Sequence, residues 1–205
     1  DVAAEFINGR PNDNIGITLF AGETFTQCPL TVDHAVLLDM IHNIKCGLIT
    51  DGTAVGMGIA NAVTRLKDSK AKSKVIILLT DGTNNKGDIS PMTAAEIAKS
   101  FGIRVYTIGV GTNGMAPYPY PVGNTVQYVS MPVEIDEKTL TEIAGTTDGN
   151  YFRATSNSKL KEVYEEIDKL EKTKLNVKEY SKRDEEYHWF ALAAFLCVLL
   201  EVLLR

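Results

Sequence analysis

The stretch Lys74-Val-Ile-Ile-Leu-Leu-Thr80, followed at once by Asp81-Gly82, decides the fold. Its continuous apolar run is typical of a strand that is buried on both faces of a parallel sheet. Asp81 then stands on a tight turn at the carboxyl end of that strand, which is the edge where ligands bind in open α/β sheets. The stretch therefore predicts a central strand that leads into a candidate functional loop.

Strands and helices alternate on both sides of this stretch. Residue spacing predicts strands over 15–21, 24–28, 103–110 and 150–154, and helices over 2–7, 33–43, 53–66, 91–100, 140–144 and from 156 or 157 to 174. Such alternation is typical of parallel strands joined by helical crossovers. We therefore expect an α/β fold with a doubly wound, mostly parallel sheet flanked by helices.

Residues 111–132 interrupt this alternation. The segment contains Pro117, Pro119, Pro121 and Pro132, and it is predicted to be a long loop. A loop of this length either packs passively or forms a surface that binds a partner, and the sequence leaves both alternatives open.

Composition excludes several classes of protein. The 205 residues are 44% hydrophobic and 23% charged, with a net charge of −5, which is ordinary for a soluble globular domain. The sequence has no excess of basic residues that could bind a phosphate backbone, so we do not expect nucleic-acid binding. The three cysteines (Cys28, Cys46 and Cys197) lack metal-ligand spacing; a single Cys28–Cys46 pair stays open.

The two ends of the chain suggest a piece of a longer membrane protein. Residue 1 is Asp and already lies in a helical pattern, so we expect further sequence upstream. Residues 189–204 carry one charge, Glu201, which favours a clipped membrane span over a buried helix. The expected division is a domain over 1–175, a charged linker over 176–187 and a transmembrane segment over 188–205.

Two clusters of oxygen-bearing side chains are candidates for a metal site. Asp81 is followed by Gly82-Thr-Asn-Asn85, and the stretch Thr50-Asp-Gly-Thr53 opens a helix elsewhere in the chain. Carboxylate and hydroxyl oxygens are ligands that hard divalent cations prefer. The alternative reading is that Asp81 is only a turn residue.

Several of these motifs resemble one family. Residues 74–82, Gly52-Thr-Ala-Val-Gly-Met-Gly-Ile59 and Ile103-Arg-Val-Tyr-Thr-Ile-Gly-Val-Gly111 resemble three conserved stretches of the von Willebrand factor A domain. Residues 20–31, 135–140 and 150–154, together with the apolar C-terminal segment, are similar to bacterial aerotolerance membrane proteins of the BatA/BatB type. The resemblance covers essentially the whole chain and strengthens the prediction of an α/β sheet.

The resemblance also implies the site. In this family a metal-ion-dependent adhesion site would take Thr53 as hydroxyl ligand and Asp81 as carboxylate, holding Mg²⁺ (or Mn²⁺ or Ca²⁺). The family's Asp-x-Ser-x-Ser motif is absent from this sequence; Ser156-Asn-Ser158 has the serine spacing, but Ala154 stands in place of the Asp. The resemblance places that motif, after an apolar span and with the family's first strand, about 20–30 residues upstream of residue 1. We therefore expect weak or no metal binding by the residues present here.

The implied function is adhesion between proteins and not catalysis. A partner in a membrane complex would complete the metal's ligands with an acidic residue, and the resemblance places the domain on the periplasmic side of a bacterial inner membrane. One alternative is a metal-independent scaffold that binds partners through residues 111–132. A purely structural role of that kind needs neither Thr53 nor Asp81.

An enzyme is the less favoured alternative. Gly109-Val-Gly-Thr-Asn-Gly114 matches a dinucleotide-binding pattern, but the Pro-rich segment after it cannot supply the helix that pyrophosphate binding requires. His34 and His42 are expected to be surface or structural residues, and no Gly-x-Ser-x-Gly nucleophile turn is present. The sequence therefore predicts neither a nucleotide cofactor nor a small-molecule substrate.

Overall fold

A three-stranded parallel sheet forms the centre of the structure. In the computed structural model, β3 (Lys74–Thr80) pairs with β4 (Ile103–Val110), and β4 pairs with β7 (Tyr151–Ala154). The residues described are 2–45, 47, 49–111, 114–122, 125–133, 135–181, 200–201 and 204. The register brings Thr80 opposite Gly109, so β3 and β4 end level at their carboxyl edge.

The remaining elements confirm most of the alternation predicted from the sequence. They are α1 (Val2–Asn8), β1 (Ile15–Phe20), β2 (Thr24–Thr31), α2 (His34–His42), α3 (Val55–Leu66), α4 (Pro91–Ser100), β5 (Gly114–Val122), β6 (Thr125–Val133), α5 (Glu137–Thr146) and α6 (Asn157–Ser181). The antiparallel pair β1–β2 forms a sheet of its own. The chain divides into two compact units, residues 1–169 and 170–205, which are described separately.

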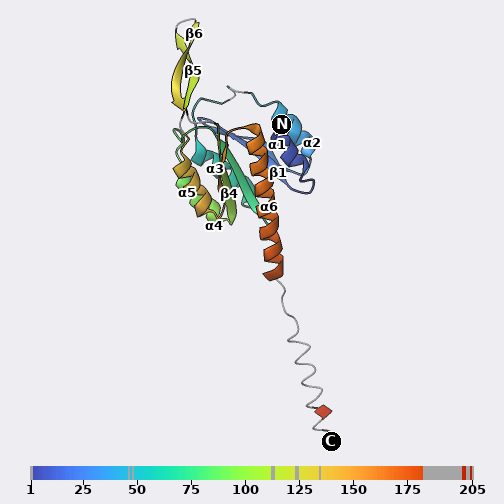
Figure 1. The fold of residues 1–205 in the computed structure, drawn as a ribbon. Helices are drawn as coiled ribbons and strands as arrows, with labels where there is room; N and C mark the ends of the chain where they lie inside the picture. The colour runs from blue at the N-terminus through green and yellow to red at the C-terminus, as the bar shows by residue number, and fades with distance from the viewer. Residues whose placement is uncertain are drawn as a thin grey trace. The chain divides into compact units, whose positions relative to one another are not determined.

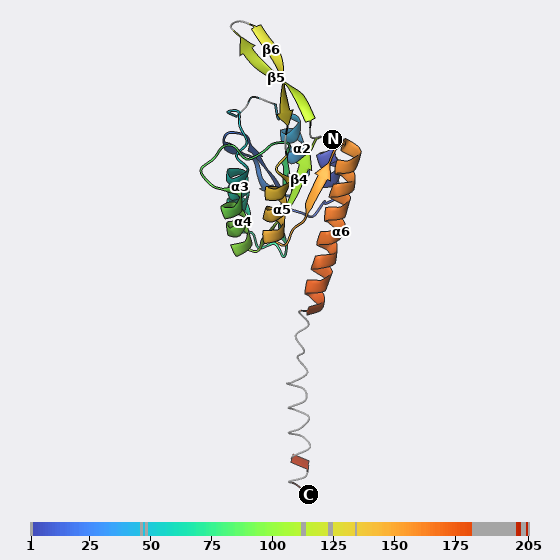
Figure 2. The ribbon, with the colours of Figure 1, turned by 60° about the vertical axis from the view of Figure 1, so that its left-hand side comes forward.

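Three helices cover one face of the parallel sheet. Figures 1 and 2 both show α3, α4 and α5 side by side along that face, with α1 and the first turns of α6 on the other side. The buried side chains of this core come from α3, α4, α5, β3 and β4, among them Ile59, Leu78, Val105 and Ile143, and from Ile135 just before α5. This arrangement confirms the expected α/β class, a parallel sheet flanked by helices.

Strand β3 is less buried than predicted. Ile76, Leu78 and Thr80 are buried beneath the helices, whereas Val75, Ile77 and Leu79 on the other face are only half-buried. Within the described residues β3 has one strand neighbour, β4. With a single strand neighbour, more of its second face stays accessible, so the expectation of a strand buried on both faces was wrong for that face.

The prediction of a loop over residues 111–132 was also wrong. Strands β5 and β6 pair along their whole length as an antiparallel hairpin, from Gly114 opposite Val133 to Val122 opposite Thr125. The prolines hid this strand pattern, because proline lacks the N–H that a ladder needs and is rare inside sheets. All four prolines occupy alternate positions of the ladder, where they remove no hydrogen bond between the two strands.

The predicted linker and membrane segment lie largely outside the described residues. Helix α6 runs to Ser181 and not to residue 174, so the first part of the expected linker, 176–181, is helical. Of the expected transmembrane segment over 188–205, only residues 200, 201 and 204 are described. Among all described residues, no helix has both the length and the apolar character needed to span a membrane.

Helix α5 begins with a side-chain cap at the carboxyl edge of the sheet. The Oδ1 atom of Asp136 accepts a hydrogen bond from the Thr139 N–H at 3.0 Å. Hydrogen bonding from the Thr139 side chain, and then from its backbone, holds the pKa of Asp136 below its usual value. The carboxylate thus satisfies one of the N–H groups left without a partner at a helix start.

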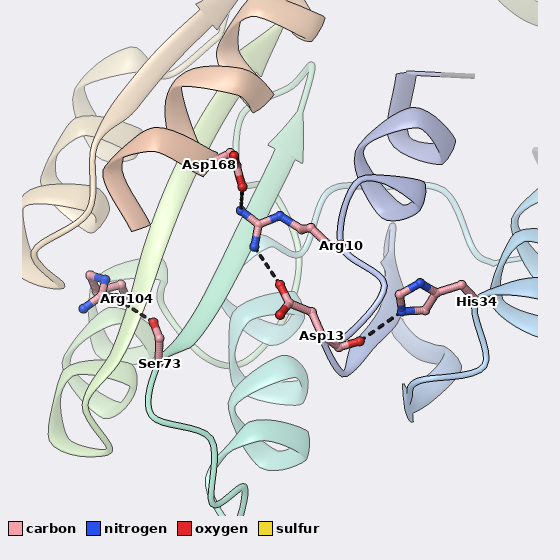
Figure 3. A network of polar contacts seen from close by, with 6 residues as sticks. All are labelled: Arg10, Asp13, His34, Ser73, Arg104 and Asp168. Atoms are coloured by element: carbon pink, nitrogen blue, oxygen red, sulfur yellow. Dashed lines mark hydrogen bonds and ion pairs between the residues drawn. The ribbon is translucent and has the colours of Figure 1, made fainter. Parts of the chain in front are cut away.

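A polar network joins α1 and the turn after it to α6 within the first unit. Arg10 donates from Nη1 to Asp13 Oδ2 at 2.7 Å and from Nη2 to Asp168 Oδ1 at 2.6 Å (Figure 3). The guanidinium lies 4.6 Å from the ring centre of Phe6, which itself packs against Tyr164 with ring centres 4.6 Å apart. The contacts fix the end of α1 against residues 164–168 of α6.

Candidate metal centre

Two loops far apart in sequence meet at the carboxyl end of β3. Thr53 donates its backbone N–H to Asn85 Oδ1 at 2.9 Å, and its carbonyl oxygen accepts the N–H groups of Asn85 at 3.0 Å and Lys86 at 3.3 Å. These three bonds hold the segment just before α3 against the segment that follows β3. The structure therefore brings together the two clusters that the sequence identified separately.

The hydroxyl of Thr53 lies beside the residue that follows Asp81. A Cβ placed on Gly82 would come 3.3 Å from Thr53 Oγ1, so the absence of a side chain there lets the threonine approach the turn. Thr53 is half-buried and Asp81 is exposed. The two predicted ligands thus stand on adjoining loops.

The loop from β1 closes a third side of this region. Gly22 donates its N–H to the Thr50 carbonyl at 2.7 Å, and Ala54 donates to the Ala21 carbonyl at 2.7 Å. Gly52 has a positive φ of 138°, and a Cβ on it would lie 3.1 Å from the Gly22 Cα. Only glycine suits both that backbone conformation and that close approach.

Asn84, in the loop that follows Asp81, has a buried side-chain oxygen. Its Oδ1 atom is shielded from solvent and makes no hydrogen bond within the described part of the chain. An unsatisfied buried amide oxygen is uncommon and costs free energy unless a donor or a cation occupies the space beside it. The sequence placed Asn84 at this edge, but its burial depends on the way the loop folds back and could not be read from spacing.

The donor set fits a hard cation in kind but not in number. Hydroxyl, carboxylate and amide oxygens are all present, yet such ions take about six oxygen ligands. Over the described residues, no group of three or more Asp, Glu, His or Cys side chains could hold a metal ion. Thr53 and Asp81 therefore offer two of the oxygen donors that the predicted site requires, and a cation held there would need other groups to complete its ligands.

His34 and His42 have structural surroundings. His34 Nε2 lies 3.0 Å from the Asp13 carbonyl (Figure 3), and His42 Nδ1 lies 2.7 Å from the Leu38 carbonyl. A carbonyl oxygen can only accept, so each ring nitrogen donates. Neither histidine is near the Thr53 loop in any contact of the described residues.

Two further sequence features take their place in the fold. Gly114, the last glycine of the dinucleotide-like pattern, begins strand β5 where that pattern requires a helix. Cys28 is a buried free thiol packed with Ile7 and Leu37. Cys46, the other member of the pair that the sequence left open, lies outside the described residues.

A comparison with known families now adds to this geometry. The sequence profile of the von Willebrand factor type A (VWA) domain matches residues 1–166. The chain belongs to this family. The resemblance inferred from its motifs is thereby confirmed for the whole first unit up to the third turn of α6.

Two solved structures resemble this VWA domain closely. BatB from Bacteroides thetaiotaomicron is 32% identical with a TM-score of 0.71, over 83% of this chain and 85% of that one. An aerotolerance-related membrane protein from Bacteroides fragilis NCTC 9343 is 28% identical with a TM-score of 0.70, over 82% and 83% of the two chains. A third structure shares the fold: proximal thread matrix protein 1 from the mussel byssus, with a zinc-occupied MIDAS (metal-ion-dependent adhesion site) motif. It is 24% identical with a TM-score of 0.60, over 82% of this chain and 39% of its own.

Curated relatives of the VWA domain are longer proteins. A UPF0353 protein of Nocardia farcinica is 30% identical over 182 residues, which are 80% of this chain and 53% of that protein. An uncharacterized protein of Borreliella burgdorferi is 28% identical over 196 residues, or 95% and 57% of the two chains. The VWA chain thus spans little more than half the length of these relatives.

Proposed function

We propose that this VWA domain binds another protein through a divalent cation held at Thr53 and Asp81. The observation that carries the proposal is the packing of the Thr53 hydroxyl against Gly82, directly after Asp81, at the carboxyl edge of β3. The zinc-occupied MIDAS motif of the mussel protein supports metal binding by a domain of this fold. Mg²⁺ is the ion that we favour, with Mn²⁺ or Ca²⁺ as alternatives, because the donors are hard oxygens.

The chain's own residues would have distinct tasks at that site. Thr53 and Asp81 would hold the ion, and Asn85 would keep the Thr53 backbone in position through the 2.9 Å hydrogen bond. The ion supplies positive charge, which an acidic side chain of the partner would complete. No proton or group is transferred, so the proposed role is adhesion and not catalysis.

The setting of this activity is a bacterial membrane. The aerotolerance-related membrane protein of Bacteroides fragilis is the similar structure that supports it. We propose that the domain belongs to an aerotolerance-type complex, anchored through the apolar segment over 188–205 in the inner membrane and facing the periplasm. The further ligands, in this proposal, are an Asp-x-Ser-x-Ser motif upstream of residue 1.

Metal titration with matched variants tests the proposal. The thermal midpoint of the intact protein is expected to rise with added MgCl₂, as binding to the folded state alone requires. Thr53→Ala and Asp81→Asn are expected to abolish that rise, whereas Asp88→Asn, an exposed carboxylate in the same loop, is expected to leave it unchanged. For the 205-residue chain alone we expect little response. An equal magnesium response in Asp81→Asn and the unaltered protein would contradict the site.

A metal-independent scaffold remains the second candidate function. The observation that favours it is the exposure of apolar side chains on the β5–β6 hairpin, with Tyr128 73% exposed. Partner capture from membranes in EDTA separates the two candidates. Binding that persists in EDTA and in Asp81→Asn would favour the scaffold, and binding that disappears in both would favour the cation.

A further inference from the structure

The β5–β6 hairpin is uncharged and forms a sheet by itself. Residues 114–133 contain no Asp, Glu, Lys, Arg or His, in a chain that is 23% charged. Within the described residues the two strands pair only with each other (Figure 1). Met115, Tyr128 and Val129 are exposed. A two-stranded ribbon is marginally stable alone, and natural sheet edges are normally protected by charges.

The prolines determine which backbone groups point outward. Pro117, Pro119 and Pro121 of β5 lie opposite Ser130, Tyr128 and Val126 of β6, and Pro132 lies opposite Met115. All four prolines therefore fall in the same alternating set of pairs. In an antiparallel ladder, one set of pairs bonds across the ribbon and the other set points its N–H and C=O groups outward. A proline in the outward set removes no cross-strand bond.

The two long edges of the ribbon consequently differ. The outer edge of β5 has prolines at three successive outward positions, so it offers carbonyl groups without N–H donors. The outer edge of β6 keeps both groups at Val126, Tyr128 and Ser130, and it ends at Pro132. One edge is closed to a further strand by its chemistry, and the other can accept one.

We propose that the β6 edge pairs antiparallel with the β6 edge of a second copy of this chain. The outward positions are symmetric about Tyr128: a twofold axis there places Tyr128 opposite Tyr128 and Val126 opposite Ser130. An uncharged strand fits an uncharged edge without burying an unpaired charge. Because each copy has one competent edge, the pairing closes at a four-stranded sheet and does not continue into a fibre. This inference does not depend on the metal site.

Charges introduced at the twofold position, Tyr128, test the pairing. Sedimentation equilibrium of the full chain is expected to show a monomer–dimer equilibrium. Tyr128→Lys and Tyr128→Glu are each expected to be monomeric, because like charges would face each other at the axis, and their equimolar mixture is expected to dimerise again. Tyr128 is exposed, so these changes leave the folded core untouched. As a matched control, Thr64→Lys, which changes an exposed residue on α3, is expected to dimerise like the unaltered chain.

Disulfide trapping provides the second measurement. In a chain with Cys46→Ser and Cys197→Ser, Tyr128→Cys is expected to cross-link to itself, and Gln127→Cys is expected to cross-link better to Val129→Cys than to itself. A chain that stays monomeric up to millimolar concentration, or dimers that are equally strong in Tyr128→Lys, would overturn the proposal. If the chain is monomeric, the β6 edge would instead be available to a strand of a different protein.

Discussion

Asn85 Oδ1 accepts the backbone N–H of Thr53 at 2.9 Å and so ties the loop after β3 to the start of α3. The bond crosses 32 positions of the sequence, and the Asn85 and Lys86 N–H groups return to the Thr53 carbonyl. Thr53 is therefore held through its own main-chain N–H and C=O groups, and its hydroxyl stays free to lie beside Gly82. The position of one predicted metal ligand thus depends on a residue that would not itself touch the metal.

We expect Asn85→Ala to weaken both the fold and the site. The Thr53 N–H would lose its acceptor, which costs about 1 kcal/mol in the free energy of unfolding. Denaturant unfolding measures that loss, and a magnesium titration of the intact protein measures the loss of affinity. Thr83→Ala, at an exposed position of the same loop, is the control and is expected to change neither. An unaltered affinity in Asn85→Ala would contradict the positioning role.

The Arg10–Asp168 pair is expected to stabilise the first unit. Arg10 and Asp168 side chains are 19% and 26% exposed and 2.6 Å apart. Asp168→Asn should lower the free energy of unfolding by about 1.5–3 kcal/mol, the range for hydrogen bonds to charged groups. The exposed pair Lys159–Glu162, also 2.6 Å apart, is the control: Glu162→Gln should have little effect. Equal effects of the two changes would show that burial does not matter here.

The cap of α5 predicts a dependence of stability on acid. The pKa of Asp136 is lowered in the folded protein, so its contribution is fully present above the unfolded pKa of about 4 and disappears as the pH falls through the folded value. Asp136→Ala should cost about 1 kcal/mol at neutral pH. Unfolding at pH 7 and at pH 2.5 measures it, and a cost that is equal at both values would contradict the charge-dependent part.

Tyr164 predicts a dependence on alkali. Burial raises the pKa of its hydroxyl to about 12, above the usual value of about 10. The unfolded chain therefore loses this proton first, so stability is unaffected below pH 10 and falls between pH 10 and 12. The difference in ultraviolet titration between the unaltered chain and Tyr164→Phe isolates this group among the eight tyrosines. A difference centred near pH 10 would refute the effect of burial.

Local patterns predicted most of the elements because local physics decides them. The apolar run of β3 and the capped start of α4, where Ser90 accepts from the Thr93 N–H and Pro91 follows, need no distant partner to be recognised. The prediction for residues 111–132 failed for the converse reason, because a distant partner decides their structure. Whether a proline is compatible with a strand depends on which way its nitrogen faces, and the pairing register decides that.

The candidate site was predictable in its residue types and not in its arrangement. Thr53 and Asp81 follow from motifs, because each motif is contiguous. The burial of the Asn84 oxygen depends on how its loop folds. The hydrogen bond by which Asn85 anchors Thr53 joins segments that no short pattern connects, as does the bridge from Arg10 to Asp168 elsewhere in the fold. These contacts exist only after the chain has folded back on itself.

By itself, the sequence determined the α/β class and the order of most elements outside residues 111–133, and it indicated two candidate oxygen ligands, because periodicity and turn chemistry act over a few residues. Only the tertiary structure decided that the Thr53 and Asp81 loops adjoin, that β3 is buried on one face more than the other, and that residues 114–133 form a ribbon with a single competent edge. Those outcomes depend on which strands and loops become neighbours. Hydrogen-bond register and side-chain packing decide this between residues far apart in the sequence, where no short sequence pattern can indicate it.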